Sequence, residues 1–155
     1  MQGHKTIIAK LNELLTTELT SIDSYFLHSR VMADLGYKQL ADHLHHEMED
    51  EMGHATKLMQ RIIFLGEAPK VHERVPFTVD RNVKSMFEVD LKFEMKVRDL
   101  LIEGIELCLN HNDHGTRQIL EELLSDTESD HIDWLETQLH LIEEIGEKRY
   151  LAEKL

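Results

Sequence analysis

The sequence predicts an all-α protein: a four-helix bundle with a long crossover between its second and third helices and a short fifth helix at the C-terminus. Two observations predict this fold. The chain of 155 residues holds only two prolines and seven glycines. Apolar residues recur at spacings of three and four along four long stretches, which is the period of an amphipathic helix. The length suits one core, so we assign residues 1–155 to a single domain.

The first two helices are expected at about residues 6–35 and 38–65. The apolar stripe of the first is Ile8, Leu11, Leu15, Ile22, Tyr25 and Met32. The stripe of the second is Leu44, Met48, Ala55, Leu58, Ile62 and Leu65. Gly36 and Gly66 follow these stretches, and glycine is the residue that most often closes a helix.

The segment from Glu67 to Arg81 contains both prolines, Pro69 and Pro76, and is expected to be an extended crossover. Its roughly 15 residues span about 50 Å when extended, whereas a helix of about 28 residues is about 42 Å long. The crossover can therefore return along a whole helix, so the second and third helices can run parallel.

The third helix is expected at about residues 82–110 and the fourth at about 116–145. The polar segment His111–Gly115 separates them. Residues 147–155, which follow Gly146, leave room for one short extra helix. No low-complexity segment interrupts this order.

The net charge of −13 argues against a nucleic-acid partner, which usually requires a basic face. It is consistent with cations as partners, although solubility alone also explains it. No apolar run approaches the roughly 20 residues of a membrane helix, and the N-terminus lacks a signal-peptide core. We therefore expect a cytoplasmic protein. Cys108 is the only cysteine and, between two leucines, is expected to be a buried thiol.

Glu51 and His54 lie three residues apart within the second helix, and this spacing places both side chains on one helix face. Glu51 stands in the apolar stripe, where a core residue is expected. A buried carboxylate costs several kcal/mol unless a partner neutralises it. The same spacing recurs at Glu128 and His131 in the fourth helix.

Glu18 and Glu94 stand in the middle of the first and third apolar stripes. Four carboxylates in one core require counter-charge, which two divalent cations supply. This arrangement is the known di-iron carboxylate pattern of helical bundles, although manganese and zinc also accept such ligands. The six expected ligands, which are also the expected catalytic residues, are Glu18, Glu51, His54, Glu94, Glu128 and His131. The alternative is that each glutamate lies slightly off its stripe and reaches water.

Over essentially its whole length the sequence resembles bacterioferritin, a branch of the ferritin-like di-iron proteins. The matching motifs are Gln2-Gly3, Leu14-Leu15, Glu18-Leu19, Tyr25-Phe26-Leu27-His28-Ser29-Arg30, Glu51-Met52-Gly53-His54, Arg61-Ile62 and His131-Ile132-Asp133-Trp134-Leu135-Glu136. The resemblance implies iron storage in a shell of 24 subunits, with Fe(II) oxidised by O2 or hydrogen peroxide at a di-iron centre inside each subunit. In this pattern Glu51 and Glu128 bridge the two irons.

The resemblance also implies haem b between two subunits, with Met52 from each as its axial ligand. Electrons from a bacterioferritin-associated ferredoxin would then release the mineral through the haem. Without the resemblance, Met52 reads as a gap-filling residue at a helix interface. Haem-binding members usually carry less acidic residues at the positions of Asp23, His45 and Glu49. The shell is expected to be a homo-oligomer, and shells mixed with a second subunit type are also known in the family.

His46 and Asp50 match an inner-surface iron site of some bacterioferritins, although a solvated polar face explains the pair equally simply. Tyr25 is expected either to serve the metal site, by a hydrogen bond or as an electron donor, or to be a core residue with a satisfied hydroxyl. The main rival function is a non-storage di-iron oxidase or peroxidase of the rubrerythrin type. Such proteins commonly carry four iron-binding cysteines, whereas this chain has one.

Overall fold

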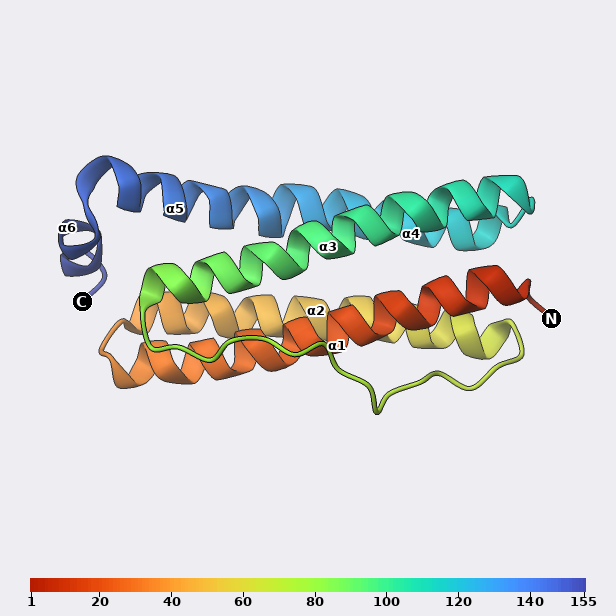
Figure 1. Ribbon diagram of the computed structural model, residues 1–155, viewed down its shortest axis with the longest axis horizontal. Helices are drawn as coiled ribbons and strands as arrows, with labels where there is room; N and C mark the ends of the chain where they lie inside the picture. The colour runs from red at the N-terminus through yellow and green to blue at the C-terminus, as the bar shows by residue number, and fades with distance from the viewer.

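The computed structural model describes residues 1–155 and consists of helices joined by turns and one long connection. The helices are α1 (Lys5–Asp34), α2 (Lys38–Phe64), α3 (Val83–Asn110), α4 (His114–Asp126), the π-helical segment η1 (Thr127–Ile132), α5 (Asp133–Ile145) and α6 (Glu147–Ala152). Segments α4, η1 and α5 follow one another without a break and form the fourth long rod of the bundle (Figure 1). The predicted four-helix bundle with a short C-terminal helix is confirmed.

The connection between α2 and α3 runs back along the α1–α2 pair, so α2 and α3 are parallel, which the expected length of the crossover allows (Figure 1). Hydrogen bonds attach this connection to α1. The Val75 backbone N–H donates to the Thr20 hydroxyl at 2.9 Å, and Arg74 donates to the Asp23 carboxylate at 2.8 Å. The crossover is thus held in place by polar side chains of the helix that it covers.

The fourth rod begins at His114, two residues before the expected start. Asp113 caps it, because its carboxylate accepts the Thr116 backbone N–H at 3.0 Å. In the middle of the rod, η1 has the wider turn of a π-helix, which bonds each residue to the fifth along and changes which side chains face inward. Thr127 is fully buried there, and the next residue, Glu128, is exposed.

The apolar core has two parts, one toward each end of the bundle. The cluster nearer the N-terminus includes Ile7, Leu11, Leu14, Leu58, Ile62, Leu101 and Leu120. The cluster nearer α6 includes Met32, Leu44, Met86, Phe87, Leu135 and Tyr150. Buried charged side chains, among them Glu18, Glu51 and Glu94, lie between these clusters, at the middle of the bundle. A layer of charge in the centre of an apolar core is the feature of this fold that needs a functional explanation.

Cys108 belongs to the first apolar cluster and is fully buried, in agreement with the prediction from its leucine neighbours. Burial raises the pKa of its thiol to about 11. The residue therefore packs as a small apolar side chain.

None of the helices combines the length and the apolar composition that a bilayer-spanning helix needs.

Candidate metal centre

Three glutamates and two histidines converge in the polar layer at the middle of the bundle. Glu18 lies on α1, Glu51 and His54 on α2, Glu94 on α3 and His131 on η1. All five are buried, and Glu51 and Glu94 have no exposed surface. The helical periodicity produces this convergence, because each residue occupies a core-facing position of its own helix.

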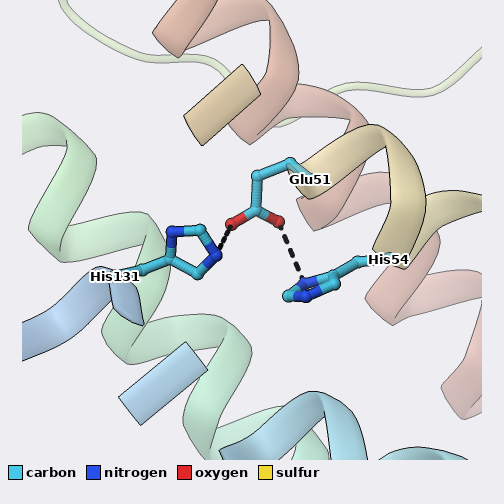
Figure 2. Close-up of side chains that lie close together, drawn as sticks. All are labelled: Glu51, His54 and His131. Atoms are coloured by element: carbon cyan, nitrogen blue, oxygen red, sulfur yellow. Dashed lines mark ion pairs between the residues drawn. The ribbon is translucent and has the colours of Figure 1, made fainter. Parts of the chain in front are cut away.

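Glu51 lies between the two imidazoles (Figure 2). Its Oε2 atom is 3.5 Å from His54 Nδ1, and its Oε1 atom is 3.6 Å from His131 Nε2. His54 Nδ1 is also 3.0 Å from Glu18 Oε2. Two ligand atoms that each lie about 2.1 Å from one metal ion are themselves roughly 3–3.6 Å apart. These separations therefore suit one cation on each side of Glu51.

The carboxylates of the centre have oxygen atoms with no hydrogen-bond partner. They are Glu18 Oε1, both oxygens of Glu51, and Glu94 Oε2. A buried carboxylate oxygen without a partner is strongly unfavourable. Together with the two imidazoles, these oxygens form the donor set that divalent iron accepts. The residues present thus fit a pair of metal ions.

Without metal ions, protons supply part of the missing positive charge. Burial raises the pKa of Glu51 to about 8, and the charge of Glu18 adds to this effect. Burial also raises the pKa of Glu94 well above its ordinary value. Burial alone lowers the pKa of His54, but the hydrogen bond to Glu18 and the nearby carboxylate of Glu51 outweigh it and raise the pKa to about 11. Metal binding must displace these protons.

His131 behaves differently from His54, since burial lowers the pKa of its imidazole to about 4. A neutral imidazole has a lone pair for a metal ion. A cavity of about 280 Å³ borders both imidazoles, and no hydrophobic residue lines it. Carboxylates such as Asp50, Asp126 and Asp130 outnumber its single lysine, Lys57, so the cavity favours cations.

The prediction that Glu128 lies in the core with the other glutamates is wrong. Its side chain is 48% exposed, and its Oε2 atom accepts a hydrogen bond from Arg98 Nε at 2.9 Å. The reason is the π-helical turn of η1, which has more residues per turn than an α-helix and breaks the expected three-residue alignment with His131. Thr127 takes the inward position instead, and its hydroxyl has no partner.

Tyr25 contacts the centre through Glu94: its buried hydroxyl donates to Glu94 Oε1 at 2.9 Å. Burial raises the pKa of this phenol, and the charge of Glu94 adds to the shift, so Tyr25 remains a proton donor. Both alternatives for this residue hold in part, because it is a core tyrosine whose partner is a candidate metal ligand.

Met52 and the pair His46 and Asp50 lie outside the centre. Met52 is 51% exposed, and the position next to it is open, because a Cβ atom on Gly53 would meet no atom within 4 Å. His46 Nε2 is 3.5 Å from Asp50 Oδ2, and both side chains are exposed to solvent. Both line a second cavity of about 580 Å³.

Sequence reasoning did not single out Glu47 and Asp126. Only 4% of the Glu47 side chain is exposed, and its Oε2 atom contacts His131 Nδ1 directly. Asp126 Oδ2 is 3.5 Å from His54 Nε2. One signal could have identified Glu47: it precedes Glu51 by four residues and so shares a helix face with it.

Comparisons with known proteins show the family of the chain. The sequence model described as a ferritin-like domain matches residues 8–145. The chain is 44% identical to the "Bacterial ferritin" of Neisseria meningitidis serogroup B, with 100% of both chains covered. It is 45% identical to the "Bacterial ferritin" of Pseudomonas aeruginosa, also over 100% of both chains. It is 42% identical to the "Bacterioferritin" of Brucella melitensis over 97% of this chain and 92% of that protein. The chain belongs to the ferritin family, among its bacterial ferritins.

Proposed function

We propose that Glu18, Glu51, His54, Glu94 and His131 bind two Fe(II) ions as substrate, with Glu51 between them. The chain itself is a ferroxidase and iron-storage protein with a di-iron centre. One observation carries the assignment of residues: four buried carboxylate oxygens at the middle of the bundle have no partner. Two divalent cations would neutralise them, which no apolar packing could do.

In this proposal the protein supplies ligands, geometry and a site shielded from water, while O2 or hydrogen peroxide accepts the electrons of Fe(II). Glu51 and Glu94 lose their protons as iron binds. Tyr25 keeps one oxygen of Glu94 in place through its hydroxyl. Glu128 remains a predicted sixth ligand, and its carboxylate would have to leave Arg98 and turn inward to reach the irons. The rubrerythrin-type alternative is not favoured, since the relatives matched over the full chain are bacterial ferritins.

Several finer features belong to the same proposal. Twenty-four copies form the shell, either alone or with a second subunit type, and the shell resides in the cytoplasm. His46 and Asp50 would bind iron at its inner surface, as their 3.5 Å separation and exposure allow. A bacterioferritin-associated ferredoxin would deliver electrons for release of the mineral.

Titration of metal-free protein with Co(II) tests the centre. Co(II) fits the same donors as Fe(II) but is not oxidised during the titration. We expect two tightly bound ions per chain, and a protein that elutes at the mass of the proposed shell in size-exclusion chromatography. Binding of none, or of one ion only, would contradict the di-metal assignment. Elution as a monomer or dimer would contradict the shell and leave the metal count unaffected.

We also propose that the assembled protein binds haem b. The exposed thioether of Met52 and the open space beside it fit a ligand that binds outside the subunit. Met52 from two copies would hold one haem, which supplies a path for electrons into the shell.

The absorption spectrum of purified protein tests this assignment. We expect a Soret band that corresponds to half a haem per chain, and we expect Met52→Leu to abolish it while the Co(II) stoichiometry stays the same. A Met52→Leu protein that retains the band would exclude Met52 as the ligand. Met59→Leu on the same helix is the matched control.

A further inference from the structure

Glu128 is the one predicted ligand that lies outside the metal centre, and a single arginine pairs with it there. Arg98 Nε donates a hydrogen bond to Glu128 Oε2 at 2.9 Å, and this bond joins α3 to η1. The two side chains are 35% and 48% exposed, so the pair lies at the surface of the bundle. While the ion pair is intact, the predicted set of six ligands lacks one carboxylate.

We propose that Arg98 holds Glu128 outside the centre in the metal-free protein and releases it when metal ions bind, so that Glu128 completes the ligand set. The proposal rests on the proposed function, because it assumes that the other five residues bind two metal ions. Arg98 is then a positioning residue that acts through Glu128. Since the guanidinium and the metal ions compete for one carboxylate, loss of Arg98 should favour the metal-bound form.

The backbone of Glu128 already lies at the edge of the buried face of η1. Thr127 directly before it and His131 three residues after it are both buried. Toward the centre, the Thr127 hydroxyl and both oxygens of Glu51 have no hydrogen-bond partner. Glutamate has a long side chain with many accessible rotamers. Rotation of this side chain from Arg98 toward Glu51 is the movement that the proposal requires.

Arg98 is placed to release Glu128 at low cost. It follows Glu94 by four residues, so it lies one turn further along the same side of α3. Its Nη1 atom lies 3.5 Å from Asp99 Oδ1, and this contact remains available when Glu128 leaves. Exposed ion pairs contribute little, because water screens their charges. A divalent cation in a buried site attracts a carboxylate more strongly, so the metal ions should take Glu128 from Arg98.

Arg98 also has a second effect on metal binding, which must be separated from the first. Its positive charge repels cations whether or not it contacts Glu128, although solvent screens this repulsion at a partly exposed residue. Repulsion persists when Glu128 is replaced by alanine, whereas competition for the carboxylate disappears. A double-mutant cycle of Arg98 and Glu128 therefore distinguishes the two effects.

Co(II) titration of the full-length assembled protein gives the product of the two dissociation constants for each variant. We expect Arg98→Met to lower this product roughly two- to fivefold, which corresponds to the strength of an exposed ion pair. Glu128→Ala should raise it about tenfold or more, as loss of a ligand requires. In the Glu128→Ala background, most of the effect of Arg98→Met should disappear.

Arg117→Met is the matched control. Arg117 is also 35% exposed, and it pairs with Glu121 within α4. This variant removes the same charge from the bundle surface and should leave the product of the Co(II) dissociation constants unchanged. An effect of Arg117→Met as large as that of Arg98→Met would mean that any surface charge acts in this way, and it would overturn the proposal.

Three other results would also overturn it while two ions still bind, so that the proposed function survives. They are wild-type affinity in Arg98→Met, wild-type affinity in Glu128→Ala, and an equal effect of Arg98→Met in both backgrounds. Crystal structures give an independent readout, in which Glu128 should bind cobalt in the Co(II) form while Arg98 keeps Asp99. A Co(II) form with both ions and Glu128 still on Arg98 would contradict the proposal. A wild-type protein that binds no pair of Co(II) ions would instead refute the proposed function itself, and this proposal with it.

Discussion

Replacing Glu94 with alanine is expected to slow Fe(II) oxidation roughly 100-fold or more, since changes to residues that merely support a metal ligand already cost 10- to 100-fold. Glu94 is fully buried, and one of its oxygens has no partner other than the proposed iron. Glu18→Ala is expected to have a similar effect, because Glu18 provides the corresponding carboxylate on the His54 side. Stopped-flow absorbance of Fe(III) formation measures both rates.

The bundle should tolerate these changes, because alanine removes a buried carboxyl group that lacks full hydrogen bonding and the two apolar clusters remain intact. Circular dichroism and size-exclusion chromatography should therefore match the wild type. Glu88→Ala is the control on the same helix, since its side chain is 56% exposed. Wild-type oxidation rates in both Glu94→Ala and Glu18→Ala would disprove the assignment of these residues.

The second large effect concerns the stability of metal-free protein as a function of pH. Burial and the nearby Glu18 charge raise the pKa of Glu51 to about 8 from an ordinary value of 4.5. Between these values the folded protein binds more protons than the unfolded chain. Its stability therefore decreases as pH rises from 4.5 to about 8. One group contributes at most about 1.4 kcal/mol per pH unit to this slope.

Glu51→Gln lacks this proton, so its free energy of unfolding should fall less steeply with pH than that of the wild type. The pKa of Glu94 is raised in the same direction, first by burial and then by the charge of Glu51, so the loss of this charge in Glu51→Gln also flattens the slope. Denaturant titrations of metal-stripped protein at several pH values between 5 and 8 measure the two slopes. Identical slopes would mean that Glu51 is not the titrating group. Added Co(II) should flatten the wild-type slope, because the ions replace the protons.

The sequence could predict the helices because amphipathic periodicity is a local property of the chain. It also located Glu18, Glu51 and Glu94, since each interrupts an apolar stripe where only a compensated charge is tolerated. The crossover followed from its two prolines and its reach. Burial of these residues needed no knowledge of their tertiary neighbours.

Two features depended on the tertiary structure. The first is the π-helical segment η1, which places Glu128 on the outside, next to Arg98. A sequence pattern that assumes a constant helical period cannot detect the change of period that begins at Thr127. Glu47 lies in an acidic stretch of the sequence, yet it is buried, and the His131 side chain from η1 contacts its carboxylate. The sequence by itself determined the fold, the family and the charged centre of the core. Only the packing of the four rods decided which carboxylates face that centre. The direction in which a carboxylate points depends on the rotation of its helix about the helix axis.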